Sequence, residues 1–193
     1  MSQRRVKTDN AHIDWKIALR KEAVSGIGHP RVLDLFAGRN LLWRDFDLGR
    51  YYGIEIVNGK GRNLFADNLR VIPSLDLSAF DVIDCDSYGS SIKQILALFA
   101  NPTLRPDTIV IFTEIHSPRD GLPKEMTEII GVDEIYRKIP SAFQKYGWDI
   151  FLSILNSKNV PFVRCYEVFE NSHTKRYGYF KVPDPSKCAK VQG

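Results

Sequence analysis

The order of apolar runs along the chain is the feature that most limits its fold. Five runs rich in β-branched and aromatic residues have the character of buried strands, and helical patterns lie between several of them. Strands that alternate with helices predict a mostly parallel sheet covered on both faces. The expected strands are Arg31–Phe36, Tyr51–Val57, a short one near Asn63–Ala66, Phe80–Cys85 and Thr108–Glu114.

The chain ends in a different pattern. Two further strand-like runs, Pro161–Phe169 and Tyr177–Val182, are separated only by Glu170–Arg176. This separation is too short for a parallel crossover, so the two runs are expected to form an antiparallel hairpin. The sequence therefore predicts an α/β fold whose mostly parallel sheet ends in an antiparallel hairpin.

Helices are expected in four places. Residues 11–25 carry Ile13, Ile17, Leu19, Ala23 and Val24 among charges and end at two glycines, which is typical of an amphipathic helix. The other helical patterns are Leu41–Leu48, Ser90–Ala100 and Met126–Gly147, the last broken at Pro140.

Little chain separates the second strand from the third. Only residues 56–66 lie between Glu55 and Asp67, so the helix of this crossover is expected to be reduced or absent. Asn58–Gly61 indicates a turn or loop instead. Part of one sheet face should then lack its usual cover, which makes that face a candidate surface for a homodimer.

Length and composition fit one globular domain. The chain has 193 residues, of which 44% are hydrophobic and 26% are charged. We expect a flexible basic arm over residues 1–10, a single domain over 11–183 and a polar tail over 184–193. No apolar run approaches bilayer length, and the N-terminus lacks the apolar stretch of a signal peptide, so no membrane association is expected.

Cysteine usage and net charge limit the compartment and the partners. Cys85, Cys165 and Cys188 are far apart and odd in number, so they form neither a disulfide framework nor a metal-ligand spacing. We therefore expect no metal and a cytoplasmic location. The net charge of +4 permits an RNA or DNA partner without requiring one.

The first strand ends in the run Asp34-Leu-Phe-Ala-Gly38, which leads into the next helical pattern. A glycine at such a turn lets a ligand approach the backbone, and a following helix offers free N–H groups. The alternative is a simple connecting turn in which Asp34 pairs locally. The positions after Gly38 do not complete G-x-G-x-x-G, which disfavours NAD and FAD, and no phosphate-binding P-loop motif is present.

Two more acids stand at strand ends. Glu55 ends the second strand, where a carboxylate can accept both hydroxyls of a ribose or simply face solvent. Asp67, followed by Asn68, comes after the third strand. Asp67 can accept the exocyclic amine of adenine or cap the helix that begins near Asn68.

The fourth strand delivers two acids and an aromatic to its end. Asp84, Asp86 and Tyr88 follow the apolar run, and Gly89 and Ser90 allow a sharp turn. Ligands of open α/β sheets bind beyond the carboxyl ends of the strands. A carboxylate and an aromatic there can hold a planar polar substrate, although Tyr88 can also be a turn aromatic that only packs.

Taken together, these residues resemble class I S-adenosylmethionine-dependent methyltransferases over roughly residues 30–182. Asp34–Gly38, Glu55, Asp67 and Asp84–Tyr88 stand in that family's order and strand positions. The terminal hairpin is similar to the end of the family's Rossmann-like seven-stranded sheet, whose strand order is 3-2-1-4-5-7-6.

The resemblance implies a cofactor, S-adenosyl-L-methionine, and a role for each matching residue. Phe36, Ala37 and Gly38 would pass beneath the methionine moiety, with Asp34 close to its amino group. Glu55 would bind the ribose, and Asp67 and Asn68 would contact adenine. Asp84 and Asp86 would face the methyl group and the substrate.

The fourth-strand motif also resembles that of amine methyltransferases, and most closely the Asp-x-Asp-Pro-Tyr/Phe-Gly-Ser stretch of tRNA guanine-N2 dimethyltransferases. Ser87 stands where that pattern has proline, and Asn40 stands where the first motif usually has glycine. Proline would fix φ and aim its carbonyl at the amine, which Ser87 does not guarantee. Asn40 is a milder departure because asparagine tolerates positive φ.

The motif implies methylation of an exocyclic amine of a nucleic-acid base. Asp86 and the Ser87 carbonyl would accept the amine hydrogens while Tyr88 stacks on the ring, and a base within a helix would first flip out. Arg4, Arg5 and Lys7 on the arm, and His173, Lys175 and Arg176 on the hairpin, can grip phosphates or merely be surface charges.

Other functions remain open on sequence grounds. One alternative is a methyltransferase for a small molecule or a protein, and another is a non-catalytic cofactor-binding or interaction module. The end of the fifth strand lacks the lysine expected for ribose methylation. His116 there can act as a base or be structural.

Overall fold

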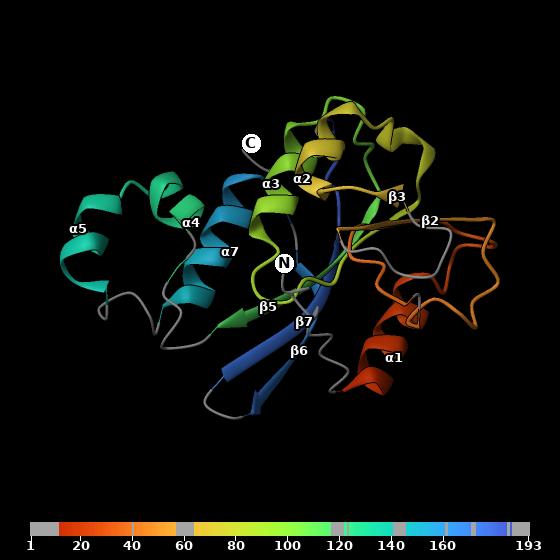
Figure 1. Cartoon of the computed structure of the whole chain (residues 1–193), viewed down its shortest axis with the longest axis horizontal. Helices are drawn as coiled ribbons and strands as arrows, with labels where there is room; N and C mark the ends of the chain where they lie inside the picture. The colour runs from red at the N-terminus through yellow and green to blue at the C-terminus, as the bar shows by residue number, and fades with distance from the viewer. Residues whose placement is uncertain are drawn as a thin grey trace, which may run out of the picture.

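The computed structural model describes residues 12–39, 41–56, 64–116, 122, 124–140, 146–160, 162–170, 173–184 and 186. Seven strands form one sheet in the order β3-β2-β1-β4-β5-β7-β6 (Figure 1), which confirms the predicted topology. The strands are β1 (Arg31–Asp34), β2 (Arg50–Glu55), β3 (Leu64–Phe65), β4 (Val82–Cys85), β5 (Ile109–His116), β6 (Phe162–Glu170) and β7 (His173–Lys181).

One strand, β7, runs opposite to the other six. The strands β3, β2, β1, β4 and β5 run parallel, whereas β7 pairs antiparallel with both β5 and β6. The register sets Asp34 opposite Gly53 on one side and opposite Asp84 on the other. The carboxyl ends of β1, β2 and β4 therefore meet at one edge, where the predicted site residues lie.

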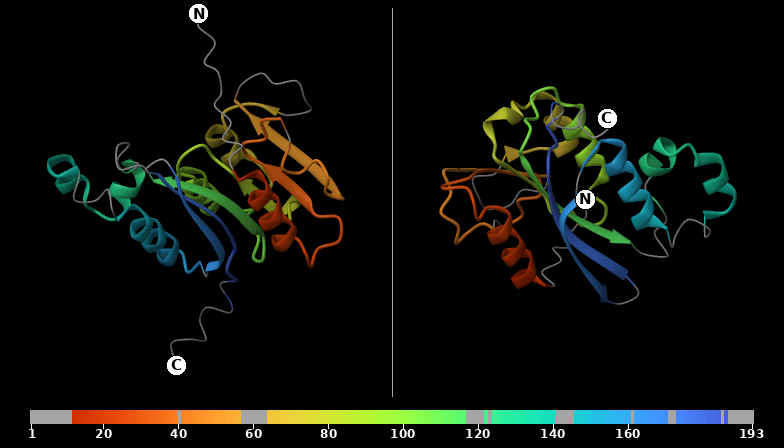
Figure 2. Two further views of the ribbon diagram at one scale, coloured as in Figure 1. Left: turned by 90° about the horizontal axis from the view of Figure 1, so that it is seen from below. Right: turned by 180° about the vertical axis from the view of Figure 1, so that it is seen from behind.

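Helices cover both faces of this sheet (Figures 1 and 2). The helices of the described residues are α1 (Ile13–Ala23), α2 (Asn68–Val71), α3 (Ile92–Ala100), α4 (Lys124–Ile129), α5 (Asp133–Lys138) and α7 (Gly147–Ser157). Of these, α5 has no buried residue and lies away from the sheet (Figure 1). Two 3₁₀ turns, η1 (Ile72–Ser74) and η2 (Leu77–Ala79), follow α2.

The core has two halves, one on each side of the sheet. On one side α3, α4 and α7 pack on alternate strand residues, including Leu33, Ile83, Val110, Phe112 and Phe180. On the other side α1 packs on the residues between them, including Val32, Val82, Ile109, Ile111 and Tyr177. This alternation is the period of two that a strand buried on both faces requires.

The prediction of a helix at Leu41–Leu48 is wrong, because this segment forms successive turns. Trp43 is buried, and its indole N–H donates to Asp84 Oδ2 at 2.7 Å. Its ring also packs on Phe46, with the ring centroids 4.8 Å apart. These tertiary contacts fix the segment in a non-helical path that the local pattern did not show.

The helical prediction for Met126–Gly147 is also partly wrong. The structure has the short helices α4 and α5 there. The chain turns between them at Gly131, whose φ is 71°. The long helix is α7, which begins where the predicted one ended. Its buried residues have helical spacing, so the signal was present: Gly147, Ile150, Phe151, Ile154 and Leu155.

The terminal hairpin is confirmed, but β7 begins earlier than predicted. His173 pairs with Glu170, so the ladder continues almost to the turn. Residues 173–176, which the sequence placed in the loop, are therefore strand. Charged side chains hid this part of the strand because only one of its faces needs to be apolar.

The connection from β2 to β3 falls mostly on residues 57–63, which lie outside the described residues, as does the turn predicted at Asn58–Gly61. Beside it Ile56, Leu64 and Phe65 are exposed, and Tyr52 is exposed farther along β2. A homodimer through this part of the sheet stays a prediction.

The arm predicted at residues 1–10 and most of the tail predicted at 184–193 also lie outside the described residues. Within the part of the chain that the structure describes, no helix combines the length and apolar character that a bilayer crossing requires.

Candidate functional site

The ends of β1 and β2 meet at the turn Phe36–Gly38. Gly38 has a φ of 49°, in the left-handed region that favours glycine. Its N–H donates to Glu55 Oε2 at 2.8 Å, and Ile56 N–H donates to the other carboxylate oxygen at 2.9 Å. Glu55 is half-buried at the last position of β2. The structure thus brings together the turn and the acid that the sequence assigned to one ligand.

Asp34 lies beneath this turn and is buried. Phe36 N–H donates to one of its oxygens at 3.0 Å, and the Tyr51 hydroxyl donates to the other at 2.9 Å. Burial, with the nearby charge of Asp84, raises the pKa of the Asp34 carboxyl to about 8. The carboxyl therefore shapes the turn from within, as the local-pairing alternative expected.

Asp67 and Asn68 both have structural contacts. Asp67 caps α2 by accepting from Leu69 N–H at 3.1 Å. Asn68 is buried, and its amide donates to Leu35 O at 2.7 Å and accepts from Gln94 Nε2 at 3.2 Å. The Asn68 side chain thus ties the end of β1 to α3. Contact of either residue with adenine stays a prediction.

Asp84 is completely buried at the end of β4. Its Oδ2 lies 2.6 Å from Arg20 Nη2 of α1 and also accepts from the Trp43 indole at 2.7 Å. Its Oδ1 accepts from Asp86 N–H at 3.1 Å. Burial outweighs the charge of Arg20 and raises the pKa of Asp84. Both oxygens thus serve the protein itself.

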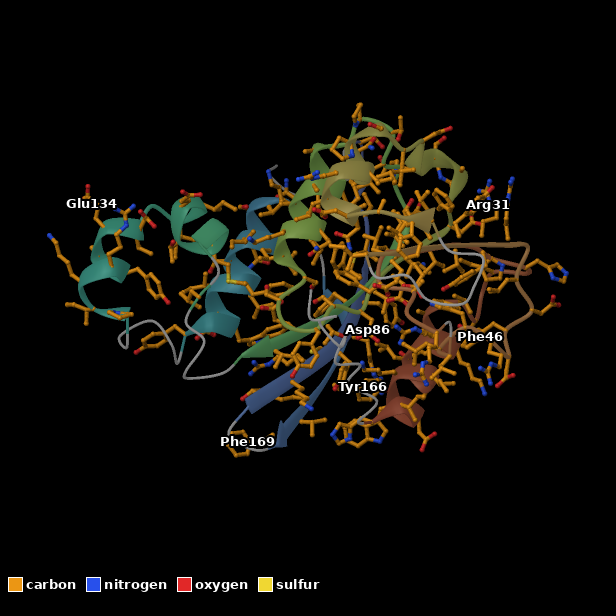
Figure 3. The ribbon with its side chains drawn as sticks, viewed as in Figure 1. Arg31, Phe46, Asp86, Glu134, Tyr166 and Phe169 are labelled. Atoms are coloured by element: carbon orange, nitrogen blue, oxygen red, sulfur yellow. The ribbon has the colours of Figure 1, made fainter. Side chains whose placement is uncertain are left out.

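Asp86 lies beside the buried pair of Arg20 and Asp84, close to the sheet and α1 (Figure 3). Lys16 Nζ lies 2.9 Å from its Oδ1, and Arg20 Nη2 lies 3.3 Å from its Oδ2. The Thr113 hydroxyl of β5 also donates to Oδ1. Burial alone would raise the pKa of this carboxyl, but the charges of Arg20 and Lys16 outweigh it and hold the pKa below its ordinary value.

The turn after Asp86 exposes one aromatic ring. Tyr88 is 66% exposed, and Gly89 has a φ of 119°. Ser87 is buried, and its hydroxyl can donate to Gly89 O at 3.3 Å or to Thr113 O at 3.4 Å. The serine therefore holds the turn by side-chain hydrogen bonding, in place of the fixed φ that proline would supply.

Comparison with known proteins gives a match by structure only. No family model and no curated protein matches the sequence. Among solved structures, the N-methyltransferase NodS from Bradyrhizobium japonicum matches with a TM-score of 0.56 and 11% identity, over 92% of this chain and 100% of that one. A putative methylase from Haemophilus influenzae matches with a TM-score of 0.55 and 13% identity, over 88% of this chain and 89% of that one.

A third match is a methyltransferase from Thiobacillus denitrificans, solved with S-adenosyl-L-homocysteine. Its TM-score is 0.50 at 14% identity, over 86% of this chain and 90% of that one. This chain has the methyltransferase fold. At such identities the likeness concerns the fold alone.

In this methyltransferase fold, four predicted site elements gather at one edge of the sheet: the Phe36–Gly38 turn, Glu55, Asp86 and Tyr88. Asp34, Asn68 and Asp84 support that edge from inside. Within the described ranges, no group of three or more His, Cys, Asp or Glu residues is placed to hold a metal ion.

Phosphate contact by the hairpin and the arm stays a prediction, and the structure places only some of the residues concerned. Arg176 pairs with Glu167 at 2.9 Å and lies over the Trp148 ring, 4.4 Å from its centroid. The Arg176 side chain is therefore already engaged in contacts within the protein. Lys175 is half-buried on β7. The basic arm and the side chains of His116 and His173 lie outside the described residues.

Sequence reasoning missed the two cations that define this site. Lys16 and Arg20 are buried together with Leu19 and Ala23, which places all four on one face of α1. Two cations on the buried face of an amphipathic helix need buried acids as partners. The acids at the end of β4 were visible in the sequence, so this pairing could have been found.

Proposed function

We propose that this chain is an S-adenosylmethionine-dependent methyltransferase that methylates an exocyclic amine of a nucleic-acid base. The observation that carries the first half is the bond from Gly38 N–H to Glu55 at 2.8 Å, which joins the positive-φ turn to the strand-end acid. The methyltransferase fold and the S-adenosyl-L-homocysteine in the Thiobacillus denitrificans structure support it.

The donor set fits S-adenosylmethionine. Glu55 is an acceptor-only carboxylate, suited to a ribose diol, and it is half-buried at the strand end. Phe36, Ala37 and Gly38 would lie beneath the methionine moiety, and Asp67 would lie toward adenine. The cofactor supplies an activated methyl group when bound. The chain's own contribution is to position the donor and the acceptor, which governs an in-line displacement.

The acceptor side is built by Asp86 and Tyr88. Asp86 is kept ionised by Lys16 and Arg20, so it can accept a hydrogen from an amine and leave the nitrogen lone pair directed at the methyl group. Tyr88 is exposed beside it and offers a face on which a planar ring can stack. The similarity of Asp86–Ser90 to tRNA guanine-N2 dimethyltransferases favours a base as that ring.

Asp84 takes a different role from the one that its sequence position suggested. It is fully buried and accepts from Asp86 N–H, Arg20 and Trp43. We therefore assign it as a positioning residue that orients the backbone of Asp86. Asp86 and Tyr88 are the residues that would touch the acceptor.

Transfer of a labelled methyl group to total tRNA, rRNA and DNA tests the function. We expect incorporation into one of these with the wild-type chain and a loss of about 100-fold or more in Asp86→Ala, because the amine loses its acceptor. Asp86→Asn is the matched variant that keeps the size of the side chain. The exposed Asp45→Ala should transfer like wild type.

Binding of S-adenosyl-L-homocysteine to each variant separates a lost acceptor from a lost fold. A variant that still binds but no longer transfers supports the role of Asp86. Unchanged incorporation in both Asp86 variants would remove that role.

A non-catalytic cofactor-binding module is the second candidate. It is favoured by the three donors that Asp86 already accepts from, Lys16, Arg20 and Thr113. Such a module would bind S-adenosyl-L-homocysteine and transfer no label to any acceptor.

A further inference from the structure

Lys16 occupies the place beside Asp86 that a cationic substrate would take. Its ammonium lies 2.9 Å from Asp86 Oδ1 and 5.1 Å from the centroid of the Tyr177 ring. A carboxylate and an aromatic face are the usual partners of an ammonium ion. The side chains of Lys16 and Asp86 are each only 8% exposed, so the pair is largely removed from water.

The charges around this pair are already balanced. Among the described residues, Lys16 and Arg20 face Asp84 and Asp86, which gives two positive and two negative charges. The third acid, Asp34, has a pKa raised to about 8 by burial and by Asp84, so it is mostly protonated at pH 7. Burial also raises the pKa of Asp84, and any proton it takes up adds positive charge.

A second cation is therefore disfavoured at Asp86. An alkyl ammonium would meet the charges of Lys16 and Arg20 where little water screens them. A neutral N–H group meets no such repulsion. A carboxylate has about four lone-pair sites, of which the described donors Lys16, Arg20 and Thr113 use three, so a further N–H donor can be accepted.

The transfer itself also needs a neutral nitrogen. The acceptor nitrogen's lone pair forms the new N–C bond, and the electrons of the broken S–C bond stay on sulfur, which gives S-adenosyl-L-homocysteine. The methylated nitrogen then loses a proton to water. A protonated alkyl amine has no lone pair and would have to lose a proton before the transfer.

We propose, as an extension that rests on the proposed function, that Lys16 is a specificity-determining residue: it fills the cation position at Asp86 and restricts the site to neutral nitrogen acceptors. Protonated alkyl amines, including the lysine side chains of proteins, are then excluded. Replacing Lys16 by an uncharged side chain leaves Asp86 one cation short and opens the site to an ammonium.

The test compares wild type, Lys16→Met and the charge-retaining Lys16→Arg. Calorimetric titration with n-butylammonium, with and without S-adenosyl-L-homocysteine, measures the cation position directly and requires no turnover. We expect at least about tenfold tighter binding of n-butylammonium to Lys16→Met than to wild type or Lys16→Arg, which corresponds to about 1.4 kcal/mol. Equal binding to all three folded proteins would overturn the role of Lys16.

Methyl transfer gives the second measurement. The acceptors are an oligonucleotide containing all four bases and a lysine-rich peptide. Lys16→Met should raise the ratio of peptide to oligonucleotide methylation by at least about tenfold, while Lys16→Arg keeps the wild-type ratio. Peptide methylation by wild type as fast as oligonucleotide methylation would contradict the restriction. Absence of cofactor binding and of all transfer would instead contradict the proposed function, and the n-butylammonium titration would still decide the role of Lys16.

Discussion

Arg20 and Asp84 form a fully buried ion pair, with the Arg20 side chain 1% exposed and the Asp84 side chain not exposed at all. Removing two charges from water is unfavourable, and a buried pair is seldom a net source of stability. Here the pair fixes the backbone of Asp86 and the position of α1 at the same time. Its role is therefore better sought in the geometry of the site than in the stability of the fold.

Glu114 of β5 is another buried acid. It accepts from the Ser90 hydroxyl at 2.9 Å and from Ser91 N–H at 3.1 Å, and so it holds the start of α3 against β5. Burial outweighs these hydrogen bonds and raises the pKa of Glu114 to about 8. The folded protein therefore keeps a proton on Glu114 at pH values where the unfolded chain has lost it.

This shift predicts that the protein loses stability as the pH rises. The contribution of Glu114 is complete below the unfolded pKa of about 4.5 and falls between there and about pH 8. While only the unfolded state is ionised, the free energy of unfolding falls by about 1.4 kcal/mol per pH unit for each such group. Asp34 should add a similar term, because its pKa is also raised to about 8.

Glu114→Gln isolates the first of these terms. Thermal unfolding followed by circular dichroism between pH 5 and 8 should show a shallower fall of Tm in the variant than in wild type. The exposed Glu134→Gln on α5 should keep the wild-type slope. The same slope in Glu114→Gln and wild type would show that Glu114 is already ionised in the folded protein.

At the scale of elements, the contact of β7 with β5 and β6 depends on a glycine. A Cβ on Gly178 would lie 2.5 Å from Phe112 Cζ and 2.7 Å from the backbone oxygen of Arg164. Phe112 itself is packed among Phe151, Phe180 and Trp148, so its ring has little room to move. The glycine lets the hairpin approach the aromatic core.

Gly178→Ala should therefore destabilise the protein by about 1–3 kcal/mol through overpacking, although alanine is well tolerated in most extended backbone. Denaturant unfolding measures the change in the free energy of unfolding. Gly26→Ala is the matched control, since a Cβ there meets no atom within 4 Å. Equal stability of the two variants would mean that the strands adjust at little cost.

The sequence predicts some of these elements far better than others. Strands β1, β4 and β5 are buried on both faces, so they stand out as continuous apolar runs, and the short link between β6 and β7 leaves only a hairpin. The helical prediction for Leu41–Leu48 failed because Trp43 is held by Asp84, a partner distant in the chain. The prediction of where β7 begins failed because Arg176 and its neighbours are polar.

The site, too, was predictable only in part. Glu55 and the Gly38 turn could be placed together because strand ends of a parallel sheet meet at one edge. The burial of Asp84 and Asp86 is not visible in β4 by itself, because it depends on Lys16 and Arg20 of α1. It becomes predictable only when the cations on the buried face of α1 are considered together with these acids. The motif after β4 thus contains two acids with different positions: Asp84 is buried inside the protein, and Asp86 lies at the site. Only the packing of α1 distinguishes them.

At the scale of the whole molecule, the fold assigns separate tasks to the two sides of the sheet edge. The β1–β2 side, with the Gly38 turn and Glu55, is the proposed cofactor side. The β4 side, with Asp86 and Tyr88 backed by α1, is the proposed acceptor side.

The α4–α5 segment projects from the body of the protein (Figure 1), and Ile129, Ile135 and Ile139 are exposed there.

Every role proposed for this site depends on cofactor binding, which calorimetric titration with S-adenosyl-L-methionine and S-adenosyl-L-homocysteine measures. We expect both ligands to bind wild type. Glu55→Ala should weaken both by about 10- to 100-fold, as for loss of hydrogen bonds to a charged group. Glu134→Ala, on the distant α5 (Figure 3), should bind like wild type. No heat with either ligand on folded wild-type protein would contradict cofactor binding, and unchanged affinity in Glu55→Ala would contradict the role of Glu55.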